Sequence, residues 1–396
     1  MSPRRRPTWV VVNQSHSPAF QRMMSALAEE LGPCVFVTGM PHGPSDELVT
    51  ITAGPGYRRG SMRQRVMSWV GFTAFAARHL LFLRGRPLVF LATNPPLLPS
   101  LAWMLRRLRG FRYVLLVWDI YPDHLVRANV MGAANPVVRW WRAAERRALE
   151  DAEAVITVGD GMASNLREKM TERGAGRVSV IHNWADTAEV RHQPKADNAW
   201  AQAHGQVGKI TVQYSGNLGA THDVMGLVDA AALLTDDPRI CLMVVGDGLG
   251  VDALREHVRR RQLPNVVLLP RQPWKDVPNL VATADIAVVS QRAGSENLSV
   301  PSKTYTALAA GSAILALTST DSDLGSLVRD HAVGAVCPAR TPHEIAAAVR
   351  SLVGDPAQFE AMRQRARQLA QTQFSPESVR RSFLAVLKPL VDRGER

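Results

Sequence analysis

The stretch Val300-Pro-Ser-Lys-Thr-Tyr-Thr-Ala-Leu-Ala-Ala-Gly311 decides how the second half of the chain is interpreted. It predicts a helix, because proline suits a first turn, where its missing N–H costs nothing, and the final glycine suits a C-terminal stop. Tyr305, Leu308 and Ala309 share an apolar stripe at helical spacing. An apolar strand is expected next, at 313–317. Taken alone, the stretch is an ordinary amphipathic helix between two strands.

The other side of this helix is polar. Ser302 and Thr306 lie one turn apart, beside Lys303, and an irregular segment, 294–299, leads into them. Backbone N–H groups, hydroxyls and an ammonium would therefore meet at one helix N-terminus. Such a place can hold an anionic ligand rich in hydroxyl groups.

Apolar strands alternate with helical stretches along the whole chain, roughly every 25 residues, a pattern that predicts parallel sheets with helices on both faces. Residues 40–62 are expected to form a long loop, and the periodicity breaks at 185–207. The strands are expected at 9–13, 34–38, 88–92, 113–118, 154–158 and 178–181, and then at 210–214, 241–245, 265–269, 286–290 and 313–317.

The expected fold is therefore α/β, with two doubly wound, Rossmann-like domains. Residues 1–187 form the first, 188–207 the linker and 208–375 the second. In such sheets, ligands bind beyond the C-terminal ends of the strands. The loops at those ends would face each other across a central cleft.

Several polar or glycine-rich segments fall at strand ends. Gly216-Asn-Leu-Gly219 lets the backbone approach a phosphate closely, or simply makes a tight turn, and Gly246-Asp-Gly248 is similar. Asp119, Asp123 and His124 follow an apolar strand. They are either helix-capping groups or acid/base and sugar-hydroxyl groups.

The positive charge is concentrated in the first half. Residues 1–200 hold 26 Lys+Arg and 16 Asp+Glu, a net +10, whereas residues 201–396 hold 21 and 19, a net +2. Between Glu47 and Asp119 there is no acidic residue and no lysine. The eleven arginines of that interval are 58, 59, 63, 65, 78, 84, 86, 106, 107, 109 and 112.

Such a basic region is either a solvated face or a surface that attracts phosphate. We expect the Arg58–Arg112 region to meet an anionic membrane. We expect no nucleic acid, because the arginines lie in one half only and no nucleic-acid-binding module is recognisable. The apolar stretch 66–83 contains Arg78 and His79, which predicts a buried or interfacial helix and not a membrane span.

Three cysteines lie far apart, without metal-ligand spacing, and are expected to be reduced. No cleavable signal segment is evident near the basic start. The expected location is the cytoplasm, with peripheral association at the inner face of the plasma membrane.

In their order and spacing, six segments resemble the retaining nucleotide-sugar glycosyltransferases of family 4, which have the GT-B fold. The likeness is greatest to the bacterial members that build capsule, exopolysaccharide and O-antigen. The segments are Trp118-Asp-Ile-Tyr-Pro-Asp123, Val178-Ser-Val-Ile-His-Asn-Trp-Ala-Asp186, Tyr214-Ser-Gly-Asn-Leu-Gly-Ala-Thr-His-Asp223, Val244-Val-Gly-Asp-Gly248, Val300-Pro-Ser-Lys303 and Leu308-Ala-Ala-Gly311.

The resemblance implies that the second domain binds a nucleoside-diphosphate sugar. The base would lie near Gly248 and Arg271, and the diphosphate near Gly216 and the helix N-terminus at 301–303. The implied donor-side residues are Gly216, Asn217, Gly219, His222, Gly246, Asp247, Gly248, Arg271, Gln272, Glu296, Ser299, Val300, Pro301, Ser302, Lys303 and Thr306.

It also implies that the first domain binds a lipid-linked or growing glycan acceptor. Asp119 would lie close to the transferred sugar, and the helix from 376 would cross back onto the first domain. Retention is expected without a protein nucleophile, a metal or a cofactor, since the leaving phosphate would guide the acceptor hydroxyl. The acceptor-side residues are Asn13, Asn94 and Asn183.

Two departures from the family pattern stand out. Many members carry two glutamates seven residues apart, but Leu298 and Thr306 occupy those positions here, and Glu296 is two residues early. Many members also carry an Arg and a Lys after the glycine-rich turn. Asn217 and the pair His222-Asp223 stand in their places here, and we expect Lys303 to supply the missing charge.

Other functions stay open. Within the fold, the acceptor could be a small natural product, or the protein could be a sugar-nucleotide epimerase. A dinucleotide oxidoreductase is disfavoured, because residues 10–20 after the first strand contain no glycine. The pattern does not choose between uridine, guanosine and thymidine donors.

Overall fold

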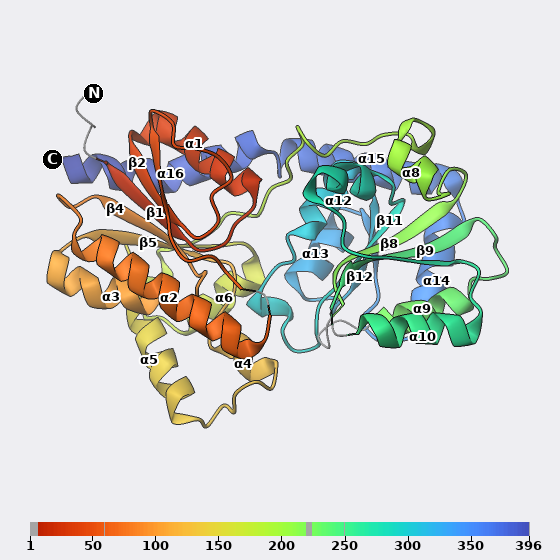
Figure 1. The fold of residues 1–396 in the computed structure, drawn as a ribbon, viewed down its shortest axis with the longest axis horizontal. Coiled ribbons are helices and arrows are strands. Elements are labelled where there is room, and N and C mark those ends of the chain that lie inside the picture. Colours follow the sequence, from red (N-terminus) through yellow and green to blue (C-terminus); the bar gives the residue numbers. More distant parts are fainter. Residues whose placement is uncertain (1–6, 59, 219–223, 249, 396) are drawn as a thin grey trace. The chain divides into compact units, whose positions relative to one another are not determined.

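The computed structural model describes residues 7–58, 60–218, 224–248 and 250–395 (Figure 1). The chain divides into two compact units, Met1–His182 with Val379–Arg396, and Asn183–Ser378. Each unit contains one parallel sheet flanked by helices. The α/β prediction is confirmed.

The first unit contains a seven-stranded parallel sheet in the order β3-β2-β1-β4-β5-β6-β7. The central strands are mostly apolar because helices cover both faces, and all five residues of β1 are buried, including the terminal Asn13. The strand order reverses between β1 and β4, which creates a switch point at their C-terminal ends. The strands are β1 (Trp9–Asn13), β2 (Cys34–Thr38), β3 (Val49–Ala53), β4 (Leu88–Ala92), β5 (Arg112–Val117), β6 (Ala154–Thr157) and β7 (Val178–Val180).

Local sequence explains where the main helices of this unit begin. The Ser17 hydroxyl accepts a hydrogen bond from the backbone N–H of Phe20 and caps α1, and Ser61 with Gln64 forms a capping box at α2. Helices α2, α3 and α5 cover one face of the sheet, and α1 lies on the other (Figure 1). The helices are α1 (Pro18–Leu31), α2 (Met62–Leu81), α3 (Leu98–Arg109), α4 (Asp123–Arg127), α5 (Pro136–Asp151), α6 (Asp160–Glu168) and α7 (Glu172–Ala175).

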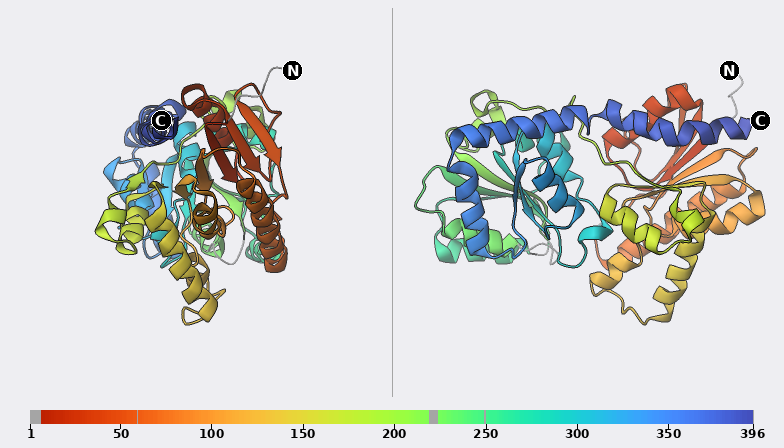
Figure 2. Two further views of the ribbon diagram at one scale, coloured as in Figure 1. Left: turned by 90° about the vertical axis from the view of Figure 1, so that its left-hand side faces the viewer. Right: turned by 180° about the vertical axis from the view of Figure 1, so that it is seen from behind.

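Residues 379–395 of α16 (Pro376–Glu395) complete the first unit. The Phe383 ring is buried and meets the edge of Phe90 on β4 at 6.1 Å between ring centres. Lys388 pairs with Glu30 of α1 at 3.3 Å, which places α16 beside α1 (Figure 2). This segment therefore covers the sheet face opposite α2 and α3.

The second unit contains a six-stranded parallel sheet in the order β10-β9-β8-β11-β12-β13, so its switch point lies between β8 and β11. The strands are β8 (Ile210–Asn217), β9 (Ile240–Asp247), β10 (Val266–Leu269), β11 (Ile286–Ser290), β12 (Ala313–Leu317) and β13 (Gly334–Val336). The α-helices are α8 (Ala199–Ala203), α9 (Val224–Ala232), α10 (Val251–Arg261), α11 (Val277–Ala282), α12 (Lys303–Ala310), α13 (Asp323–Asp330), α14 (Pro342–Val353) and α15 (Pro356–Thr372).

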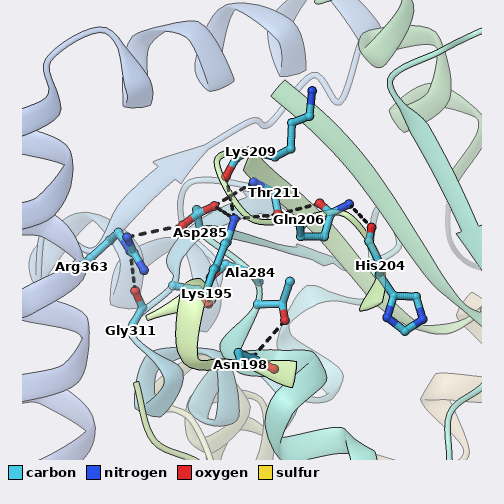
Figure 3. A network of polar contacts seen from close by, with 12 residues as sticks. Lys195, Asn198, His204, Gln206, Lys209, Thr211, Ala284, Asp285, Gly311 and Arg363 are labelled. Atoms are coloured by element: carbon cyan, nitrogen blue, oxygen red, sulfur yellow. Dashed lines mark hydrogen bonds and ion pairs between the residues drawn. The ribbon is translucent and has the colours of Figure 1, made fainter. Parts of the chain in front are cut away.

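A buried carboxylate joins three distant segments of this unit (Figure 3). Asp285, just before β11, pairs with Lys195, and its other oxygen lies 3.4 Å from Arg363 on α15. Its carboxylate also accepts the backbone N–H of Thr211 at 2.8 Å. Burial lowers the pKa of Lys195, although Asp285 opposes this shift. The network holds the segment before β8 against the second sheet.

Three local expectations differ from the structure. The interval 40–62 contains β3, and the expected linker 188–207 contains a 3-10 helix (Lys195–Asp197) and α8. Helix α12 begins at Lys303 and not at Pro301, although Gly311 ends it in the left-handed conformation, as expected. No helix in the described ranges is long and apolar enough to cross a membrane.

Candidate functional site

The glycine-rich ends of β8 and β9 lie side by side in the second unit, with Gly216 opposite Gly246. A Cβ on Gly246 would lie 1.9 Å from the carbonyl oxygen of Gly216, so no side chain fits between the strands. The backbone of Leu218 then donates to the Asp247 carbonyl at 2.8 Å. At the C-terminal edge of the sheet, beside the switch point, the backbone of these two strands is therefore not covered by their own side chains.

Lys303 places its ammonium at the same edge. Its Nζ lies 4.2 Å from the centre of the Tyr214 ring on β8, and a Cβ on Gly216 would lie 3.8 Å from it. Burial lowers the pKa of Lys303 to about 8. Within the described residues this ammonium has no carboxylate partner. A desolvated cation beside open backbone is suited to an anion.

Lys303 is itself the first residue of α12. Ser302 at the N-cap is exposed and forms no side-chain capping bond, and the backbone N–H groups of Thr304 and Tyr305 donate to the carbonyls of Pro301 and Ser302. Thr306, one turn later, is half-buried, whereas Tyr305 and Leu308 are fully buried, as the apolar stripe predicted. The polar Ser302 and Thr306 therefore keep contact with solvent, whereas Thr304 of the same helix is buried.

The loop before α12 is fixed by two buried side chains. The Gln291 amide donates to the backbone carbonyls of Glu296 and Ser299, at 3.1 and 2.8 Å. The Glu296 carboxylate pairs with the Arg340 guanidinium at 2.6 Å, and both side chains are largely buried. Glu296 therefore shapes the loop that carries Ser299, Val300 and Pro301, and its charge is already paired.

The proposed base-binding residues follow β9 and β10. The Asp247 carboxylate accepts the backbone N–H of Arg271 at 3.3 Å, which brings these two strand ends together. The Gln272 amide donates to the Pro270 carbonyl. Arg271 and Gly248 are both exposed. Gly219 and His222 lie outside the described residues, as does the side chain of Asn217.

In the first unit, the switch point carries two of the expected asparagines. Asn13 ends β1, and its side chain is buried with neither amide atom paired in the described part of the chain. Asn94 follows β4, and its amide donates to the Ser15 carbonyl at 3.0 Å. Asn183 belongs to the second unit.

Asp119 lies one strand further on, after β5. Its backbone N–H points to the Thr93 hydroxyl at 3.5 Å, and no hydrogen bond to its carboxylate is found in the described residues. Burial raises the pKa of Asp119 above its ordinary value, while nearby His124 opposes the shift. The His124 Nδ1 atom is buried without a partner among the described residues. This pair is available for acid/base work.

Asp123 is not available in the same way. Its two carboxylate oxygens pair with Arg142 and Lys169, both at 2.6 Å. Burial alone would raise the pKa of Asp123, but the two cations hold it below its ordinary value. Lys169 also reaches Glu145, whose pKa burial raises to about 7. The catalytic role expected of Asp123 stays a prediction, and the structure shows that the charge of this carboxylate is already paired with two cations.

Sequence reasoning missed three side chains around these sites. Tyr214 supports Lys303, Arg340 neutralises Glu296, and Gln14 bridges the loop after β1 to Ser68 at 2.8 Å. Only Tyr214 had a local signal, because it precedes the glycine-rich turn on an apolar strand. In the described ranges, no three His, Cys, Asp or Glu side chains are grouped as metal ligands would be.

Two family models divide the chain between them. Residues 16–184 match the glycosyl transferase 4-like domain, and residues 197–369 match the glycosyl transferases of group 1. Together with the two parallel sheets, they define the class of protein. The chain is a glycosyltransferase of the group 1 type with the GT-B fold.

Known relatives agree with this class. The chain is 25% identical to the probable glycosyltransferase WbjE of Pseudomonas aeruginosa, over 85% of this chain and 86% of that one. It is 28% identical to WcaI of Escherichia coli strain K12, named as a colanic acid biosynthesis glycosyl transferase, over 59% and 58%. The fold matches Anabaena HepE, solved with UDP-glucose, with a TM-score of 0.72 and 16% identity, over 96% and 99%.

Proposed function

We propose that this chain transfers a sugar from a nucleoside diphosphate to a lipid-linked or growing glycan, with retention of the anomeric configuration. The observation that carries the proposal is the Lys303 ammonium, held 4.2 Å from the Tyr214 ring centre beside Gly216. It lies where an anion meets both bare backbone and a helix N-terminus. A diphosphate matches this arrangement in charge.

The donor would be held by the C-terminal edge of the second sheet. Lys303 and the N-terminal N–H groups of α12 stabilise the diphosphate, which gains negative charge as the glycosidic bond breaks. The base lies along Gly248 and Arg271, where β9 and β10 end together. Thr306 supplies a hydroxyl toward the ribose in place of the glutamate that many family members use.

The acceptor would be handled by the first unit. Asp119, partly desolvated and with its carboxylate unpaired in the described structure, accepts a hydrogen bond from the acceptor hydroxyl and orients it. His124 lies beside it and opposes the rise of its pKa. The buried amide of Asn13 has both donor and acceptor capacity for a sugar hydroxyl.

Retention needs no protein nucleophile in this scheme. The departing phosphate oxygen takes the proton of the acceptor hydroxyl, and the hydroxyl attacks the anomeric carbon on the face that the phosphate leaves. The glycosyl C–O bond to phosphate breaks as the new C–O bond forms. The residues named above supply position and charge stabilisation, with no metal or cofactor proposed.

A donor panel tests this proposal directly. Calorimetric titration with uridine, guanosine and thymidine diphosphate sugars should show saturable binding of one nucleotide class. Proton NMR of the product, or of the released sugar, should show the donor's anomeric configuration at early times. The absence of binding across the whole panel contradicts the transferase proposal, and an inverted product contradicts retention alone.

A further inference from the structure

One face of α2 is exposed yet apolar. A surface helix ordinarily turns polar side chains to water. Here the buried face packs Trp69 and Phe72 against the first unit, while Met67 is 73% exposed and Val70 is 52% exposed. We define the α2 face as the exposed apolar residues that lie along one side of this helix: Val66, Met67, Val70, Ala74 and Leu81.

The apolar surface continues beyond the end of α2. Phe82 is 77% exposed, and Leu108 near the end of the neighbouring helix α3 is 73% exposed. The Arg109 guanidinium donates to the Leu83 carbonyl at 2.9 Å, which ties the C-terminal ends of α2 and α3 together. Figure 1 shows these two helices side by side on one face of the first unit.

Arginines surround this apolar surface. Arg63 is exposed before the α2 face and Arg78 within it. Arg84 and Arg86 follow Phe82, and Arg107 flanks Leu108. No carboxylate pairs with Arg63, Arg78 or Arg84 within the described residues. No acidic residue occurs in the sequence between 47 and 119. The positive field is therefore not neutralised locally.

We propose that the α2 face, with Phe82 and Leu108, docks on an anionic phospholipid bilayer. The apolar side chains would enter the boundary between headgroups and acyl chains, and the arginines would bind lipid phosphates while their stems lie along the apolar surface. An anionic bilayer matches both the positive charge and the apolar side chains of this surface. A nucleic acid would match the charge but would leave the apolar side chains exposed to water.

This docking surface lies in the first unit, apart from the donor edge of the second. The inference therefore does not depend on the proposed sugar transfer. If both hold, the first unit is held at the surface where a lipid-linked acceptor resides. A failure of lipid binding would leave donor binding intact, so the two proposals can fail separately.

Vesicle flotation of the full-length protein tests the docking surface. The vesicles contain phosphatidylcholine alone, or about 30% phosphatidylglycerol in phosphatidylcholine. We expect binding only to the anionic vesicles. Binding should fall at least tenfold from 0.1 to 1 M salt, since the screening length falls from about 10 to about 3 Å.

Two double variants separate the apolar and cationic contributions. Met67→Asp with Val70→Asp, and Arg63→Glu with Arg78→Glu, should each lower vesicle binding at least tenfold. Val207→Asp, which changes an exposed apolar residue of the second unit, should leave binding unchanged. Equal melting temperatures and equal donor binding confirm that all three variants fold.

Three results would overturn the inference. The first is equal binding to neutral and anionic vesicles. The second is unchanged vesicle binding by both double variants. The third is a lipid-free dimer, seen by light scattering, that the Met67→Asp and Val70→Asp variant dissociates, because the α2 face would then be an interface between two copies of the chain.

Discussion

At the scale of single residues, Lys303 should dominate donor affinity. We expect Lys303→Ala to weaken donor binding about 10- to 100-fold, because a charge-assisted hydrogen bond is worth about 1.5–3 kcal/mol. Lys209→Ala is the matched control, since Lys209 is exposed in the same unit and its ammonium donates to the Pro238 carbonyl. Calorimetric titration of both variants checks this, and equal affinities would remove Lys303 from the donor site.

The lowered pKa of Lys303 predicts a pH dependence. A lysine is charged below its pKa, and burial lowers this one to about 8 from the ordinary 10.5. Donor affinity should therefore be constant below about pH 7 and should weaken as the pH rises through about 8. The Lys303→Ala variant should lack this dependence. A wild-type affinity that stays flat to pH 9.5 would contradict it.

Asp119 should affect turnover and not donor binding. We expect Asp119→Asn to lower kcat about 100-fold, as is typical for a lost acid/base or orienting group, while the donor KM stays within about twofold. Because the pKa of Asp119 is raised, its carboxylate is protonated at a pH above the ordinary pKa of an aspartate. Wild-type kcat should therefore fall at that higher pH as the solution is made more acidic. Steady-state kinetics across pH test both points, and an equal change in donor KM would point to a structural role.

Asp123 should affect stability instead. Removing its charge leaves Arg142 and Lys169 without their shared partner, so Asp123→Asn should lower the free energy of unfolding by about 1–3 kcal/mol at pH 7. The pKa of Asp123 is lower in the folded protein than in the unfolded chain, where it is near 4. The stabilisation is therefore fully present above about pH 4 and is lost as the pH falls through the folded-state pKa. In denaturant titrations, the difference in unfolding free energy between the wild type and Asp123→Asn should be smaller at pH 3 than at pH 7.

At the scale of secondary-structure elements, the close approach of β8 and β9 gives a sharp test. Gly246→Ala should destabilise the second unit by about 2 kcal/mol or more, because its Cβ would lie 1.9 Å from a backbone oxygen that cannot move without parting the strands. Gly132→Ala is the control, since nothing lies within 4 Å of its added Cβ. Thermal unfolding of both variants checks the prediction, and equal shifts would contradict it.

Most elements could be predicted from the sequence, because buried parallel strands are continuous apolar runs. Strand β3 was missed, since Val49–Ala53 is short, half-exposed and set among glycines and prolines. The ion pairs of Asp123 could not be predicted, because its partners, Arg142 and Lys169, are distant in sequence. Lys303 was recognised from its place at a helix start, but its contact with the Tyr214 ring depends on packing across the switch point.

At the scale of the whole molecule, the division into two units predicts separable unfolding. Phe383 is buried against Phe90 in the first unit, and Phe374 is buried against Tyr305 in the second. Phe383→Ala should cost about 3 kcal/mol and lower only the melting transition of the first unit. Phe374→Ala should lower only the other one.

Differential scanning calorimetry of the wild type and the two variants resolves the transitions. Addition of the nucleotide should raise the transition that Phe374→Ala lowers, since the proposed donor site lies in the second unit. If both variants lower both transitions equally, the two units unfold as one and the separation is wrong.

Helix α16 also has a consequence for the order of synthesis. The first unit comprises residues 1–182, but the segment that covers one face of its sheet is 379–396. At roughly 5–20 residues per second, a ribosome needs roughly 10–40 s to make the residues in between. During that interval the sheet face around Phe90 has no α16 to cover it. The newly made first unit is therefore a substrate for chaperones and proteases until nearly the whole chain described here has been translated.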